Sequence, residues 1–94
     1  MRRIKITKSI TAQNVFSDAA RVVDKSLSIS VAGIAGGSVV WLQRKVIGGS
    51  DWVDVESYSA NTEKNVVSVG AWDYRLGVKT GGFGSGTVKV VLAT

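Results

Sequence analysis

Apolar and polar residues alternate one by one in several short stretches of the chain. The clearest are residues 72–80 and 86–92, each with apolar residues at every second position. Strict alternation over this length predicts β-strands that bury one face. Because the glycine-rich residues 81–85 join them, we expect these two strands to form an antiparallel hairpin.

The same alternation predicts further strands at residues 3–7, 25–31, 38–47, 52–59 and 66–69. Glycine-rich turns at 33–37 and 48–51 separate some of them, and the second turn is of the hairpin type. Residues 60–64 read as a polar connection. Residues 9–18 are mixed and predict a loop or short strand. Residues 17–23 offer a capped helical turn as an alternative, but Val22 and Val23 favour a strand.

Seven or eight short strands, spaced about ten residues apart and without a long helix, predict an all-β fold. The architecture that fits is a single antiparallel β-sandwich, with either an immunoglobulin-like or a jelly-roll strand order. The alternation does not distinguish these two orders. Residues 1–8 form a basic N-terminal arm or edge strand, and residues 9–94 form the sandwich domain.

Composition argues against several kinds of chemistry. The chain has no cysteine and no histidine, so thiolate sites and the commonest general base are missing. Asp54 and Glu56 lie two residues apart on a predicted strand, so we expect their side chains to share a face. They could act as a carboxylate pair or bind a hard cation, but a solvated surface beside lysines is the favoured interpretation. The glycine string at 81–86 precedes a strand, so it lacks the helix N-terminus of a phosphate loop. We expect no catalytic residues, no cofactor and no metal.

The chain is basic, with a net charge of +5 and a pI near 9.9. The basic residues that cluster are Arg2, Arg3, Lys5 and Lys8, whereas the others are scattered. Such an arm suits an acidic protein neighbour, or nucleic acid, although we do not expect direct nucleic-acid binding. No apolar run reaches the ~20 residues needed to span a membrane.

Aromatic residues are the remaining candidates for recognition. Trp41, Trp52 and Trp72 could form a stacking surface for sugars or bases, although core or interface packing is the more usual role in a small sandwich. Phe83 lies among glycines at a predicted loop tip and is expected to be the most exposed aromatic. It is therefore a leading candidate for contact with a partner.

Several of these segments together resemble small β-sandwich proteins encoded in the virion gene clusters of tailed bacteriophages. The pattern covers approximately residues 9–92 and consists of residues 40–44, 48–49, 52–55, 58–63, 74–81 and 85–90. Proteins of this kind look like head decoration (cement) proteins or other accessory virion components. The resemblance carries no catalytic motif.

The resemblance implies a mechanical role on the outside of a capsid, after synthesis in the bacterial cytoplasm. The expected partner is the major capsid protein, bound by a homo-oligomer that bridges adjacent subunits. Arg2, Arg3 and Lys5 are candidate contacts in the arm, with strand addition as one mode. Phe83 and the loop containing Ile34 are candidate contact tips. The alternatives are a tail or head–tail junction component, a carbohydrate-binding module, and a nucleic-acid-binding β domain.

Overall fold

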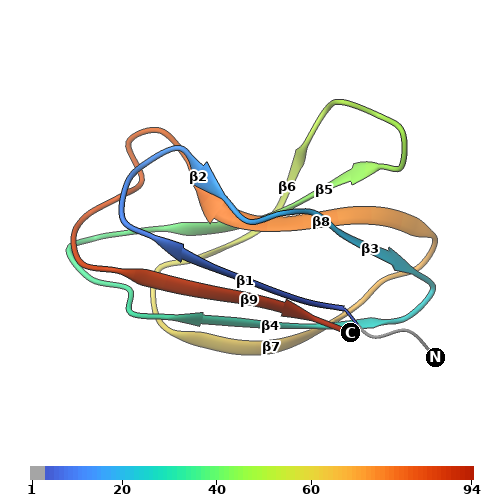
Figure 1. Ribbon diagram of the computed structural model, residues 1–94, viewed down its shortest axis with the longest axis horizontal. Helices are drawn as coiled ribbons and strands as arrows, with labels where there is room; N and C mark the ends of the chain where they lie inside the picture. Colours follow the sequence, from blue (N-terminus) through green and yellow to red (C-terminus); the bar gives the residue numbers. More distant parts are fainter. Residues whose placement is uncertain (1–3) are drawn as a thin grey trace.

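The computed structural model describes residues 4–94, which form nine β-strands and no helix (Figure 1). The strands are β1 (Lys5–Ile10), β2 (Val15–Phe16), β3 (Ala20–Val23), β4 (Ser26–Ala32), β5 (Val40–Val46), β6 (Val53–Tyr58), β7 (Thr62–Val67), β8 (Ala71–Val78) and β9 (Val88–Ala93). The all-β prediction is confirmed, and the region with a helical alternative contains strand β3. Among residues 4–94 there is no helix long and apolar enough to cross a membrane.

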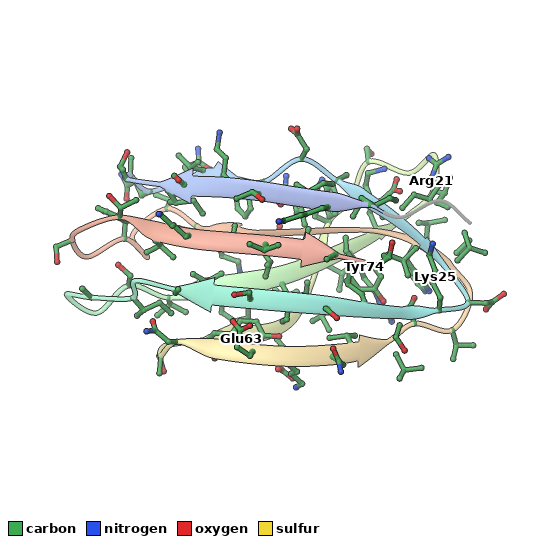
Figure 2. All side chains as sticks on the ribbon, turned by 60° about the horizontal axis from the view of Figure 1, so that its bottom comes forward. Arg21, Lys25, Glu63 and Tyr74 are labelled. Atoms are coloured by element: carbon green, nitrogen blue, oxygen red, sulfur yellow. The ribbon has the colours of Figure 1, made fainter. Side chains whose placement is uncertain are left out.

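Two antiparallel sheets pack together as a sandwich, as predicted. Sheet A has the order β1-β9-β4-β7, and Figure 2 shows it in front, with Glu63 on the edge strand β7. Sheet B has the order β2-β8-β5-β6, and β3 also pairs with β8. Strands β2 and β3 are therefore two segments of one broken edge strand along β8.

The strand order is that of a jelly roll. When β2 and β3 count as one strand, every connection crosses from one sheet to the other except the β5–β6 hairpin. This gives the eight-stranded arrangement of two Greek keys. In an immunoglobulin-like domain the last two strands share a sheet, whereas here β8 lies in sheet B and β9 in sheet A.

The predicted hairpin of the last two strands is therefore wrong, although both strands exist. Strand β8 pairs with β2, β3 and β5, and β9 pairs with β1 and β4. Alternation specifies which face of a strand is buried but not which strand lies beside it. The glycine-rich connection crosses the sandwich, and the two strands face each other across the core.

The core consists of residues from both sheets. It contains Ile10, Ala20, Val22, Leu27, Ile29, Val31, Val40, Leu42, Tyr58, Tyr74, Leu76, Val78, Val88, Val90 and Leu92. The alternation on β4, β8 and β9 predicted their inward residues correctly. Tyr74 is 1% exposed, and its hydroxyl forms a hydrogen bond with Oγ of Ser68 at 3.1 Å. The most buried phenol thus has a polar partner within the core.

A β-bulge on β6 overturns the expectation that Asp54 and Glu56 share a face. Leu42 pairs with Glu56, whereas Gln43 pairs with Asp54, so Val55 is an extra residue. The insertion turns Asp54 to the outer face of sheet B and leaves Glu56 on the side that faces sheet A. A change of one residue in register reverses which face a side chain occupies.

Glu56 closes one edge of the sandwich. Nζ of Lys64 on β7 lies 2.5 Å and 2.8 Å from its carboxylate oxygens, which links the edge strands of the two sheets. The hydrogen bond with Lys64 is the main cause that lowers the pKa of Glu56. The Tyr58 hydroxyl is buried near this carboxylate, but the two groups do not meet the geometric criteria of a hydrogen bond. Burial first, and the carboxylate second, raise the pKa of this phenol.

Candidate partner-binding surfaces

The loops that contain Ile34 and Phe83 lie together at the end of the sandwich opposite the start of β1 and the C-terminus (Figure 1). Ser38 joins them, because its Oγ accepts a hydrogen bond from Gly84 N at 2.7 Å and donates one to the carbonyl of Ala35 at 2.9 Å. A Cβ at Gly84 would lie only 2.1 Å from the Gly36 carbonyl oxygen. The glycines here permit close contact between the loops.

Phe83 is not the exposed tip that its position among glycines predicted. Both Phe83 and Ile34 are half-buried and pack against the hydrophobic core. The prediction of an exposed Phe83 is wrong because the two loops fold onto each other and direct its ring inward. The structure leaves the contact role of these two residues a prediction.

The described part of the basic arm begins at the other end of the molecule. Lys5 is exposed at the start of β1, opposite Ala93, and Arg2 and Arg3 lie outside the described residues. The C-terminal residue is held to the first described residue there, since Thr94 N donates to the carbonyl of Ile4 at 2.9 Å. The loop tips and Lys5 are therefore at opposite ends of the sandwich and do not form one continuous site.

A different cluster covers the outer face of sheet B, and we call it the cation–aromatic face. It consists of Phe16, Arg21, Trp41, Gln43, Lys45, Trp52, Asp54, Asp73, Arg75 and Lys79. Strand pairing explains the assembly: Gln43 pairs with both Asp54 and Arg75, and cross-strand partners project on the same side of a sheet. The face has four cations and two carboxylates, hence an excess of positive charge.

Two ionic clusters organise this face. In the first, Asp73 binds Nε of Arg21 at 3.3 Å and Nζ of Lys45 at 3.2 Å. In the second, Asp54 binds Lys79 and accepts a hydrogen bond from Gln43 Nε2 at 2.9 Å. Both carboxylates thus have cationic partners and hydrogen bonds in place.

The pKa values of both carboxyl groups reflect these contacts. Hydrogen bonds from Lys79 and then Gln43 lower the pKa of Asp54. For Asp73, burial raises the pKa, but hydrogen bonds from Arg21 and Lys45 outweigh burial and lower the net value. Both groups are therefore ionised at neutral pH.

The cations also lie over aromatic rings. The Arg75 guanidinium carbon lies 3.9 Å from the Phe16 ring centroid and 4.3 Å from that of Trp52. Nζ of Lys79 lies 4.2 Å from the Trp41 centroid. Such contacts contribute roughly 0.5–2 kcal/mol each, more when they are desolvated. They fix long side chains that a solvated sheet would leave mobile.

Local sequence explains how the Arg75 stack forms. Phe16 pairs with Gly77, and its Cδ1 would lie 2.2 Å from a Cβ at that position. The absence of a side chain at Gly77 leaves room for the Phe16 ring over β8, beside Arg75. Gln43 and Asp73 are each only 6% exposed, although both lie on an outer face. The long side chains of this face therefore bury polar groups outside the sandwich core.

Trp72 does not belong to the cation–aromatic face. It pairs with Val22 and Val46, on the inward side of sheet B, near the β5–β6 hairpin. Arg44 lies 3.9 Å over its ring, and its Nε1 donates to the carbonyl of Val69 at 2.9 Å. The three tryptophans considered from the sequence thus divide into two on the face and one at the end of the sandwich.

Among residues 4–94, no group of three or more carboxylates is placed to hold a metal ion. Comparisons with protein-family models, with curated proteins and with solved structures find no match for the chain.

Proposed function

We propose that this protein is a non-enzymatic structural protein of a tailed-bacteriophage virion, a capsid decoration protein that binds and stabilises the major capsid lattice. The observation that carries the proposal is the cation–aromatic face. Tryptophan and arginine are enriched at the energetic centres of protein interfaces, where they are held in fixed positions. Here Trp41, Trp52 and Arg75 are fixed on one outer face by their own neighbours.

The fold and the residue pattern support the same proposal by analogy. Jelly rolls occur in viral capsid proteins, but also in lectins and cupins, so the fold alone does not choose a function. The resemblance to phage accessory proteins favours the first group. Many copies on one lattice would bind with avidity even if each contact is weak. A homo-oligomer that bridges neighbouring capsid subunits would oppose their separation under the pressure of packaged DNA.

The test is co-sedimentation of the purified protein with expanded, DNA-free capsids of its source phage at low and moderate salt. We expect saturable binding at a fixed ratio to the capsid subunit. Recovery with tail fractions alone would replace decoration by the junction alternative. Absence from every particle would remove the virion proposal altogether.

A carbohydrate-binding module is the second candidate, because Trp41 and Trp52 lie on the same outer face as the hydrogen-bonding groups of Gln43 and Asp54. Against it, cations already lie over both rings, where a sugar would have to stack. A glycan panel monitored by tryptophan fluorescence tests it, and a glycan that changes the emission at micromolar concentration would favour this candidate.

A further inference from the structure

Arg75 differs from the other cations of the cation–aromatic face. Arg21 and Lys45 share the carboxylate of Asp73, and Lys79 binds that of Asp54. Among residues 4–94, no carboxylate lies within ion-pair distance of Arg75. The hydrogen bond that it makes runs from Nε to the neutral Oε1 of Gln43 at 2.8 Å. Its charge is therefore not compensated by an anion within the described chain.

The guanidinium is nevertheless half-buried and held in one orientation. Phe16 on β2 and Trp52 next to β6 come from opposite sides of β8 in the sheet order, and both rings contact the guanidinium. Nε of Arg75 donates its hydrogen bond to Gln43, so the two terminal nitrogens of the guanidinium remain available at the outer edge of the planar group. An immobilised guanidinium edge matches the two oxygens of a carboxylate.

We propose that Arg75, with Phe16, Trp52 and Gln43, forms a clamp that binds an aspartate or glutamate side chain of a partner protein. The clamp rests on the proposed function in one respect, namely that the partner is the capsid subunit. A half-buried cation without an anion is unfavourable in the free protein. A carboxylate that docks in the clamp completes the ion pair without reorganising the side chains, because the stack already fixes them.

Charge on the rest of the face favours a protein carboxylate over a nucleic-acid phosphate. Asp54 and Asp73 lie on the same outer face as Arg75. A nucleic-acid strand carries a charge at every nucleotide and would bring its phosphates against these carboxylates. Acidic side chains of a protein lie on separate flexible stems, so one carboxylate can enter the clamp while its neighbours in the partner chain turn away from Asp54 and Asp73.

The test uses isothermal calorimetry of the full chain at low salt with poly-L-glutamate, and with a poly-dT strand of equal total charge for comparison. We expect poly-L-glutamate to bind more tightly than poly-dT. Arg75→Gln should weaken poly-L-glutamate binding by about tenfold or more, as for loss of a charge-assisted pair at an interface centre. Arg75→Lys keeps the charge but loses the planar fork and should weaken binding nearly as much.

Lys89→Gln is the matched control, because Lys89 is exposed on β9 in the other sheet and the substitution removes the same charge. It should leave the affinity within about twofold, since an exposed charge contributes little. Equal weakening by Lys89→Gln and Arg75→Gln would reduce the effect to net charge and overturn the clamp. Tighter binding of poly-dT, or no binding of poly-L-glutamate, would also overturn it.

Thermal unfolding of each variant separates loss of the site from loss of the fold. If the Arg75 variants do not fold, Trp52→Ala removes one wall of the clamp from the half-exposed position before β6 and should weaken poly-L-glutamate binding in the same way. Retention of wild-type affinity in that variant would count against the proposal. This assay contains no capsid, so it tests the clamp separately from capsid binding. The calorimetry can refute the clamp while co-sedimentation supports capsid binding, and co-sedimentation can refute capsid binding while the calorimetry supports the clamp.

Discussion

Replacement of Gly77 by alanine tests whether the outer layer of sheet B depends on a missing side chain. A Cβ at Gly77 would lie 2.2 Å from Cδ1 of Phe16 and 2.5 Å from the carbonyl oxygen of Val15. Ordinary contacts begin near 3.4 Å, so the ring must move by about 1.2 Å and the carbonyl by about 0.9 Å. The ring can rotate, but the carbonyl belongs to the backbone of β2.

The expected cost follows from these movements. Overpacking by one methyl group costs about 1–3 kcal/mol. The pairing of β2 with β8 involves Val15 and Phe16, and loss of one or two backbone hydrogen bonds adds about 0.5–1.5 kcal/mol each. We expect Gly77→Ala to lower the free energy of unfolding by about 1.5–6 kcal/mol, and the contact between Phe16 and Arg75 to be lost with it.

Urea unfolding followed by tryptophan fluorescence measures this difference, and an unchanged m-value shows that the same surface is exposed. Gly49→Ala is the control: this glycine has no positive φ, and its Cβ would meet the Val46 carbonyl oxygen at 3.1 Å, in the exposed β5–β6 turn. It should cost less than about 1 kcal/mol. If Gly77→Ala is no more destabilising than Gly49→Ala, the outer layer does not depend on Gly77 as argued.

Three further substitutions probe the core, the ionic clusters and the sandwich edge. Leu76→Ala, at a position that is 0% exposed, should lower the unfolding free energy by about 2–5 kcal/mol in the same urea assay, and a loss below 1 kcal/mol would contradict tight packing there. Asp73→Asn should make the free energy of unfolding fall less steeply below about pH 4. The pKa of Asp73 in the folded protein lies below its ordinary value of 3.8, so the ionised carboxylate stabilises the fold above about pH 4, and that contribution is lost as the pH falls further. Urea midpoints measured at successive pH values test this, and equally steep limbs in both proteins would refute it. Lys64→Val removes an inward-facing charge from edge strand β7 and should promote association of folded protein, visible as larger species in sedimentation velocity. Thr7→Val on edge strand β1 removes no charge and is its control, and a size distribution of Lys64→Val equal to that of the wild-type protein would show that the charge does not protect the edge.

The faces of most strands follow from local sequence alone. The alternation on β4, β8 and β9 specifies their buried residues because a one-residue slip would expose the whole hydrophobic set. Strand partners do not follow in the same way, since inward residues of any two strands are chemically alike. The β8–β9 hairpin prediction therefore failed although both strands were placed correctly.

The candidate surface was visible in the sequence only in parts. Alternation places Gln43 and Trp41 on one face of a strand, and Arg75 and Lys79 on one face of another. The two pairs come together only because β5 and β8 are neighbours in the sheet. Asp54 joins them only because of the bulge at Val55, for which the residues around it give no signal. Phe83 shows the converse error: glycine neighbours suggested a free loop, whereas they allow two loops to pack closely.

Two edges of the sandwich support the proposal that a partner binds the cation–aromatic face and not an edge strand. Edge strands expose unpaired backbone groups, and this sandwich places the Glu56–Lys64 pair across one edge and breaks another into β2 and β3. Both features disfavour the addition of a further strand. On the outer face of sheet B, by contrast, cations and rings are held rigid, and Arg75 has no anion among residues 4–94. Because those two edges are protected and the outer face of sheet B is preorganised but electrostatically incomplete, we expect binding by that face to gain free energy with little reorganisation.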